Sequence, residues 1–163
     1  MIPKDMVIGT KHLMNNYGTL EILEYRGRRE VAVLFESGYT TMSTSDNIRN
    51  GRVRDPYYPK YFSKGFLGEG PYTLREDRPA FDKWKNMLER CYGDRYPAYK
   101  DCSVSKDWLN FQNFAEWING QSNAFTKGYE LDKDIKVPGN KIYSADRCQI
   151  VTKEDNLAQR HGK

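Results

Sequence analysis

Two aspartates and one asparagine near the C-terminal end have the residue types and spacing of a small metal site. Asp132 and Asp134 lie two positions apart in the stretch 131–135, which reads LDKDI. In an extended strand alternate side chains point to one face, so both carboxylates would project together. Asn156 follows in a polar stretch that begins near Thr152 with residues typical of a helix start. Carboxylate and amide oxygens suit Mg²⁺ or Mn²⁺, so we expect these three side chains to hold one divalent cation.

The elements that must position these side chains are predicted to be a hairpin and a helix. Residues 131–135 alternate like a strand, residues 138–140 (Pro-Gly-Asn) supply turn chemistry, and residues 142–151 form the return path. With the helix that starts near Thr152, this order makes a ββα unit. A competing interpretation leaves the two aspartates on a solvated strand face, with Asn156 in a local hydrogen bond.

Two helices are predicted upstream of this unit, over residues 79–92 and 105–119. Apolar side chains recur in both at helical spacing, and Gly93 and Gly120 follow as stop signals. The aromatic side chains that we assign to the core are Trp84, Trp108, Phe111, Phe114 and Trp117. Both helices carry more aromatic surface than a solvated helix needs, so we expect them to pack on each other and on the hairpin.

The first third of the chain has the composition of β-strands. Residues 17–25, 30–36 and 38–43 show period-two apolar patterns or strand-forming residues, and an Arg-Gly-Arg-Arg turn separates the first two. Short strands joined by tight turns are typical of a small sheet or barrel.

A length of 163 residues is enough for one medium domain or two small ones. We place a linker at residues 66–78, where Gly68 and Gly70 interrupt regular structure. The predicted fold class is therefore α+β. A small N-terminal β-sheet or barrel domain occupies residues 1–65, and residues 79–163 contain the two helices and the C-terminal ββα unit.

Composition narrows the class of protein and of partner. Lys and Arg number 26 against 22 Asp and Glu, a net charge of +4, which permits a polyanionic partner without requiring one. No stretch approaches the roughly 18 apolar residues of a membrane span, and the N-terminal residues lack the apolar core of a signal peptide. We expect a cytoplasmic protein with no membrane partner. No glycine-rich phosphate loop is present, so we expect no organic cofactor.

The three cysteines allow two interpretations. Cys91, Cys102 and Cys148 form no Cys-x-x-Cys pair, and their odd number argues against a disulfide framework. Together with His161 they could ligate zinc, although scattered single ligands are a weak signal. The other interpretation, which we favour, is that they are buried, reduced thiols.

Basic residues interleaved with aromatic ones indicate nucleic-acid binding, because cations contact phosphates and aromatic rings contact bases. The candidates are Arg26, Arg28, Arg49, Arg52, Arg54 and Lys60, with Arg160 in the predicted C-terminal helix. Arg160 follows Asn156 at i+4, so both would lie on one helix face, where Arg160 could contact a phosphate. The competing interpretation is that arginines in turns are solvated charge, diluted by glutamates on neighbouring strands.

Several segments together carry a family resemblance. They are residues 84–92 (WKNMLERCY), 101–117 (DCSVSKDWLNFQNFAEW), 131–135 (LDKDI) and 139–144 (GNKIYS), then Cys148 and Asn156, and at the front 15–25 (NNYGTLEILEY), Phe35, Gly38, Tyr39 and 48–56 (IRNGRVRDP). On these residues the chain resembles a family of phage-encoded proteins related to HNH (His-Me finger) endonucleases. The resemblance covers most of the chain.

The resemblance implies one divalent cation held between a strand and a helix. It assigns the strand position to Asp132 or Asp134 and the helix position to Asn156, with the cation stabilising charge on the phosphate and the leaving oxygen. The family pattern has a histidine at the end of the strand, which activates water. Here the matching residues are Asp132-Lys133 or Lys133-Asp134, and the motif is degenerate because this strand has no histidine.

The only histidines of the chain are His12 and His161, so a carboxylate would replace the usual base. The catalytic candidates are therefore Asp134 and Asn156. We expect a phage DNA-binding protein related to HNH endonucleases, with DNA cleavage that depends on Mg²⁺ or Mn²⁺. The alternative is a catalytically inactive scaffold that binds a host or phage protein as a counter-defence or regulatory factor.

Overall fold

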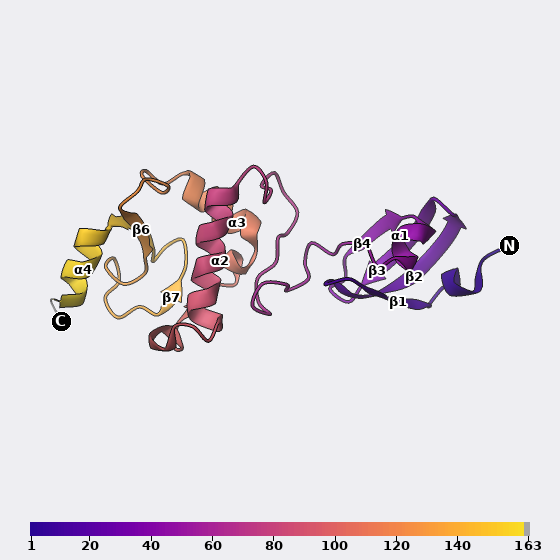
Figure 1. The fold of residues 1–163 in the computed structure, drawn as a ribbon, viewed down its shortest axis with the longest axis horizontal. Helices are drawn as coiled ribbons and strands as arrows, with labels where there is room; N and C mark the ends of the chain where they lie inside the picture. Colours follow the sequence, from indigo (N-terminus) through magenta and orange to yellow (C-terminus); the bar gives the residue numbers. More distant parts are fainter. Residues whose placement is uncertain (162–163) are drawn as a thin grey trace. The chain divides into compact units, whose positions relative to one another are not determined.

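The structure, a computed structural model, describes the backbone of residues 1–161 and the side chains of residues 1–158. It contains both helices and strands, as expected for an α+β fold (Figure 1). The chain divides into two compact units, Met1–Lys60 and Tyr61–Lys163. Among the described residues, no helix combines the length and the apolar character that a membrane crossing requires.

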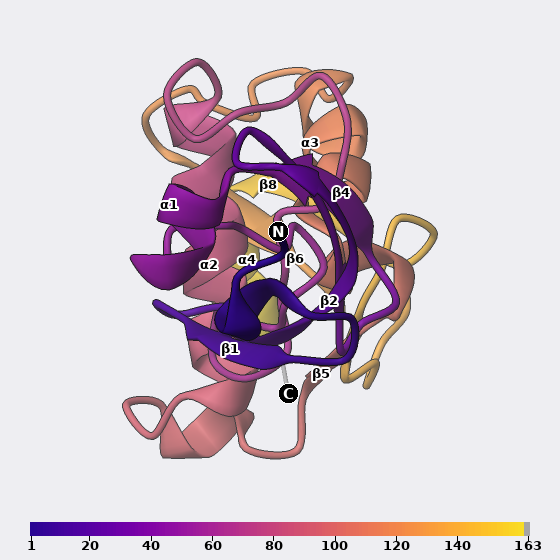
Figure 2. The same ribbon diagram turned by 90° about the vertical axis from the view of Figure 1, so that its right-hand side faces the viewer.

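The first unit is a four-stranded antiparallel sheet with the strand order β1-β2-β3-β4 (Figure 2). The strands are β1 (Lys11–Met14), β2 (Gly18–Gly27), β3 (Glu30–Phe35) and β4 (Thr40–Ser43). The short helices η1 (Lys4–Met6) and α1 (Ser45–Arg49) complete the unit. The predicted period-two pattern places Leu20, Ile22, Val31 and Val33 in its core. Burial alternates along β1, where Lys11 and Leu13 are exposed and Met14 is buried, but its sequence Lys-His-Leu-Met has no polar–apolar alternation and did not indicate a strand.

The second unit is built around α2 (Arg78–Tyr92) and α3 (Phe111–Asn119), which pack against each other. Their aromatic stripes meet in one core: the ring centroids of Trp84 and Phe111 lie 5.3 Å apart. The indole N–H of Trp84 donates a 2.7 Å hydrogen bond to the carbonyl of Trp108, so this buried polar atom is satisfied. Apart from Trp117, which is partly buried, the aromatic side chains predicted for the core are buried.

Residues 66–78, predicted as a linker, lie within the second unit and pack against α3. The side chain of Gln112 accepts a hydrogen bond from the N–H of Tyr72 (3.0 Å) and donates to the carbonyls of Leu67 (3.0 Å) and Tyr72 (2.9 Å). Gly68 has a φ of +69°, and a Cβ at this position would collide with the side chain of Asn110. The segment is therefore a structured strap over α3.

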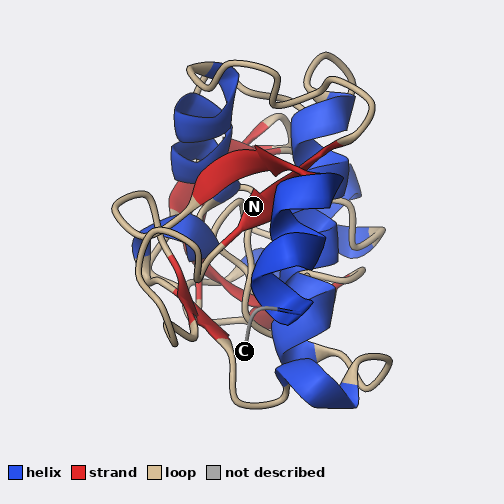
Figure 3. Ribbon diagram, turned by 90° about the vertical axis from the view of Figure 1, so that its left-hand side faces the viewer, coloured by secondary structure: helices blue, strands red, loops and turns tan. Residues whose placement is uncertain are grey.

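The C-terminal part of this unit consists of short strands joined by loops (Figure 3). β6 (Tyr129–Asp132) pairs antiparallel with β8 (Gln149–Thr152), and α4 (Lys153–His161) follows directly, so the strand–strand–helix order is present. The loop between β6 and β8 contains β7 (Ile142–Tyr143), which pairs in parallel with β5 (Ser103–Val104). The short helices η2 (Pro97–Tyr99) and η3 (Asp107–Leu109) flank β5.

Candidate functional site

A cleft of about 510 Å³ lies at the end of β6. Its walls come from α2, from residues 96–99 around η2, from β6 with the turn that follows, from β7, and from α4. In Figure 1, β6 lies between α2 and α4. Three predicted site residues, Asp132, Asp134 and Asn156, line this one cleft.

Asp132 is the last residue of β6, and its carboxylate ends the strand. It is buried, with 5% of its surface exposed, and its Oδ2 accepts hydrogen bonds from the backbone N–H groups of Asp134 (3.0 Å) and Ile135 (2.7 Å). Burial raises the pKa of Asp132; the N–H of Ile135 opposes this rise, and the neighbouring carboxyl of Asp134 adds to it. The strand β6 therefore ends at Asp132, and residues 133–135, predicted as part of the strand, form a turn.

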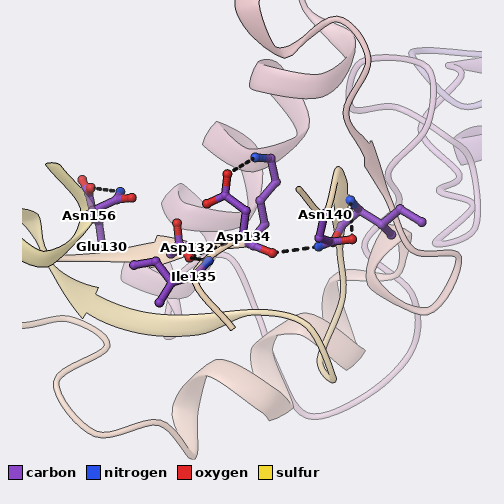
Figure 4. Close-up of polar contacts among 8 residues, drawn as sticks. Glu130, Asp132, Asp134, Ile135, Asn140 and Asn156 are labelled. Atoms are coloured by element: carbon purple, nitrogen blue, oxygen red, sulfur yellow. Dashed lines mark hydrogen bonds and ion pairs between the residues drawn. The ribbon is translucent and has the colours of Figure 1, made fainter. Parts of the chain in front are cut away.

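The turn after β6 brings Lys133 into the cleft beside the acids. An uninterrupted strand would have placed Lys133 on the face opposite Asp132. In the structure its ammonium lies 3.5 Å from Oδ2 of Asp134, and both side chains are largely buried (Figure 4). The same ammonium lies 5.6 Å from the ring centroid of Tyr99 and 5.9 Å from that of Tyr143. The ammonium of Lys133 is thus held by a carboxylate and two aromatic rings.

Asn156 reaches the cleft from the first turns of α4 and is buried, with 6% of its surface exposed. Its Nδ2 donates to Oε1 of Glu130, while no described residue donates to its amide oxygen (Figure 4). Sequence reasoning did not select Glu130. The available signal was its spacing, because Glu130 precedes Asp132 by two positions and so shares its strand face.

Arg90 supplies a second cation from α2, and it too was not selected from the sequence. It lies close to Tyr143, Tyr99 and Glu130 in the same cleft. Burial acts to lower the pKa of Arg90, but Tyr143, Tyr99 and Glu130 together raise it above its usual value. The guanidinium is therefore a fixed positive charge in the wall of the cleft.

Asn140 fixes the loop that carries the lysine and the second aspartate. Its Nδ2 donates to the carbonyls of Lys133 (2.8 Å) and Ile142 (2.7 Å), and its Oδ1 accepts from the guanidinium of Arg147 (3.1 Å). Figure 4 shows the first of these bonds bridging from Asn140 toward the end of β6. The Asn140 side chain therefore positions site residues as well as belonging to the predicted turn.

Three of the candidate nucleic-acid-binding arginines in the first unit are paired with acids. Arg26 contacts Glu24 (3.0 Å) and Glu30 (3.5 Å). Arg28 contacts Asp46 at 2.9 Å. Nε and Nη2 of Arg49 each donate a hydrogen bond to the carboxylate of Asp5. The remaining first-unit candidates are Arg52 and Arg54, which are exposed, and Lys60, whose ammonium lies 5.0 Å from the ring centroid of Tyr17. The side chain of Arg160 lies outside the described residues.

The three cysteines are free and buried in the second unit. Burial raises the pKa of Cys91 and of Cys148 to about 12, so both remain protonated thiols near neutral pH. The fourth residue considered for zinc, His161, has its side chain outside the described part of the chain.

The donors in the cleft fit a divalent cation that keeps several of its waters. Over the described residues, no group of three His, Cys, Asp or Glu side chains is arranged to enclose a metal. Mg²⁺ often takes one or two protein carboxylates and completes its shell with water. The Asp132 carboxylate and the amide oxygen of Asn156 are oxygen donors of this kind, and both face the same cleft. Among the described residues that line the cleft, three carboxylates stand against two cationic side chains, which favours a cation.

Comparisons with known proteins identify no relative. No protein-family model, no curated protein and no solved structure matches this chain. The function of the cleft is therefore inferred from its geometry and its chemistry.

Proposed function

We propose that the second unit binds nucleic acid and holds one divalent cation, Mg²⁺ or Mn²⁺, at Asp132 and Asn156 for cleavage of a phosphodiester bond. One observation carries the proposal. Asp132 at the end of β6 and Asn156 on α4 are both buried, and they line a single cleft together with the cations Arg90 and Lys133. Buried charged groups gathered in a cleft are more typical of a functional site than of a structural one.

The charge balance of the cleft makes metal and phosphate interdependent. The cleft's described lining residues include three carboxylates and two cationic side chains, a formal charge of minus one that repels phosphate. A bound divalent cation reverses the sign to plus one. We therefore expect nucleic acid to bind in this cleft more strongly when Mg²⁺ or Mn²⁺ is present.

The side chains of the cleft have different proposed roles in cleavage, according to their chemistry. Arg90 and Lys133 bind phosphate oxygens, since both are positive and face the cleft. Asp134, which lines the cleft without ending the strand, accepts the proton of the attacking water. Asp132 and Asn156 hold the cation, which supplies charge stabilisation at the phosphate and the leaving oxygen. The family resemblance supports the last of these roles, because it assigns the cation to Asp132 or Asp134 on the strand and to Asn156 on the helix.

A cleavage assay tests the proposal. Supercoiled plasmid is incubated with the full-length protein and Mg²⁺, Mn²⁺ or Ca²⁺, beside the variants Asp134→Ala and Asn156→Ala. We expect nicking with Mg²⁺ or Mn²⁺, and a loss of 100-fold or more, on the order of a removed catalytic group, in both variants. Asp107→Ala is the matched control, because Asp107 is an exposed aspartate of the same unit at the start of η3.

A thermal-shift measurement tests the cation separately from cleavage. We expect Mn²⁺ to raise the melting temperature of the wild type, because a ligand that binds only the folded state stabilises it. Asn156→Ala should abolish this rise, while Asp107→Ala should keep it. Absence of both the rise and the nicking would contradict the proposal.

A non-catalytic protein-binding scaffold is the second candidate function. Two contacts favour it, since both are typical of a structural turn. One oxygen of Asp132 accepts hydrogen bonds from two backbone N–H groups, and Lys133 forms an ion pair with Asp134. This candidate predicts that Asn156→Ala lowers stability without changing any response to cations. It also predicts nucleic-acid affinity that is negligible at physiological salt, with or without Mn²⁺.

A further inference from the structure

A pair of tyrosines forms one wall of the cleft and has no part in the roles assigned above. Tyr96 is the N-cap of η2 and Tyr99 is its last residue, and both line the cleft. Their ring centroids lie 6.2 Å apart with an interplanar angle of 87°. Tyr96 leaves 38% of its surface exposed, so its ring is accessible from solvent.

The backbone holds this wall in place. The N–H of Tyr99 donates to the carbonyl of Tyr96 (3.0 Å), and the N–H of Cys102 donates to the carbonyl of Tyr99 (2.8 Å). Cys102 itself is buried in the core of the second unit. The two rings are therefore presented by a hydrogen-bonded turn anchored to the core, which lowers the entropy cost of using them in binding.

Cationic groups accompany the rings. The guanidinium carbon of Arg95 lies 5.5 Å from the ring centroid of Tyr96, and the ammonium of Lys133 lies 5.6 Å from that of Tyr99. Arg90 lies close to Tyr99 on the other wall. Aromatic faces for bases, with cations within reach for phosphates, are the combination that single-stranded nucleic acid requires.

The size of the cleft and the requirement for base stacking both favour single-stranded nucleic acid over a duplex. A volume of about 510 Å³ is within the range of pockets that enclose one small ligand. In a duplex the faces of the bases are covered by their neighbours, so an aromatic side chain can stack only on a base that is unpaired.

We propose that this cleft takes an unpaired nucleotide of a single-stranded nucleic acid, with the base against Tyr96 and Tyr99 and the phosphate toward Arg90 and Lys133. This inference depends on the proposed function, since it names the substrate class of the same site. The expected preference is for a single strand over a duplex of the same sequence.

Fluorescence anisotropy with the full-length protein tests the preference. A labelled single-stranded DNA oligonucleotide and the corresponding duplex are titrated in the presence of Ca²⁺. We expect tighter binding of the single strand, and Tyr96→Ala should weaken that binding by about tenfold, the typical loss for one stacked base. Tyr96→Phe, which keeps the ring, should bind like the wild type. Tyr57→Ala is the control, because Tyr57 is a comparably exposed tyrosine of the first unit (36%).

A second measurement does not depend on any variant. An oligonucleotide that carries 2-aminopurine loses fluorescence when that base stacks on an aromatic ring, so quenching on addition of the protein supports the inference. Equal affinity for single strand and duplex, no quenching, or a loss of affinity in Tyr96→Phe as large as in Tyr96→Ala would each overturn it. If metal-dependent nicking persists in that case, the proposed function stands without this substrate preference. Absence of both nicking and binding contradicts both.

Discussion

Each unit of the protein buries an aspartate, and the two aspartates have different surroundings. Asp55 of the first unit leaves 2% of its surface exposed, and Asp132 of the second leaves 5%. Oδ2 of Asp55 accepts from the hydroxyl of Ser37 (2.7 Å), and Oδ1 accepts from the N–H of Tyr57 (2.9 Å). The hydrogen bonds from the backbone to Asp132 both go to one oxygen, and the carboxyl of Asp134 lies beside it.

The difference separates a structural carboxylate from a candidate functional one. Folding needs donors around a buried negative charge, and the surroundings of Asp55 supply them on both oxygens. The second carboxyl beside Asp132 opposes its ionisation. Such an arrangement is typical of sites that recruit a cation or a proton. The comparison therefore supports a structural role for Asp55 and the proposed cation-binding role of Asp132.

The largest expected effect tests the structural half of this comparison. Asp55→Ala removes the acceptor of two hydrogen bonds and leaves the Ser37 hydroxyl and the Tyr57 N–H without it. We expect the free energy of unfolding to fall by about 2–3 kcal/mol, as for other hydrogen bonds to a buried charged group. Urea unfolding, followed by circular dichroism, measures this change.

The control for that measurement is Asp46→Ala in the same unit. Asp46 is 53% exposed and pairs with Arg28, so its removal should leave the urea midpoint nearly unchanged. If Asp55→Ala costs no more than Asp46→Ala, the structural assignment of Asp55 is wrong.

A smaller loss is expected at a neutral buried group of the second unit. Gln112→Leu removes three hydrogen bonds that tie residues 66–78 to α3. Each such bond contributes about 1 kcal/mol net, and the leucine recovers part of the loss by apolar burial, so we expect a decrease of about 1–2 kcal/mol. Gln121→Leu, which removes one 3.3 Å bond to the carbonyl of Trp117, is the control. Equal losses in the two variants would mean that the strap does not stabilise the unit.

Much of the fold could be predicted because its signals are local. The alternation in β2 and β3 and the apolar stripes of α2 and α3 follow from the geometry of a single strand or helix. The end of β6 could not be predicted this way. Alternation continues through Asp134, but the carboxylate of Asp132 bonds the backbone beyond it and turns the chain. A hydrogen bond of this kind competes with strand pairing, and the residue pattern does not reveal which prevails.

The residues that the sequence analysis selected for the site all come from one stretch of the chain. Asp132, Asp134 and Asn156 belong to one segment, and the structure places all three in one cleft. Arg90 and Tyr99 come from far upstream, and only tertiary packing brings them beside the acids. In sequence Arg90 is one charged residue of an amphipathic helix, so no local signal distinguishes it. The metal and the substrate of the cleft remain predictions.

A pH titration tests the functional half of the comparison through Asp132→Asn. In the folded protein the pKa of Asp132 is raised above its ordinary value of 3.8, first by burial, so the folded state binds this proton more tightly than the unfolded state. The stability that this group contributes is fully present below the ordinary pKa and is lost as the pH rises through the folded pKa. An asparagine does not titrate, and its amide oxygen still accepts from the two backbone N–H groups.

The stability of Asp132→Asn relative to wild type should therefore increase from about pH 3 to about pH 7. Urea unfolding of both proteins at several pH values measures this trend, and Mn²⁺ should no longer stabilise the variant. An opposite trend, with the variant becoming less stable than the wild type as the pH rises, would show that the surroundings of Asp132 stabilise it as a carboxylate.

The smallest effect is expected at the best-formed surface ion pair of the first unit. Arg49 binds Asp5 with two nitrogens, but both side chains are exposed, so water and salt screen the attraction. Arg49→Ala should leave the urea midpoint almost unchanged and should not alter nucleic-acid affinity, because the arginine is already neutralised. Arg90→Leu should weaken that affinity markedly, since Arg90 faces the cleft. If the anisotropy titration shows equal losses for the two variants, the interface with nucleic acid extends to the arginines of the first unit, and the division of roles between the two units is wrong.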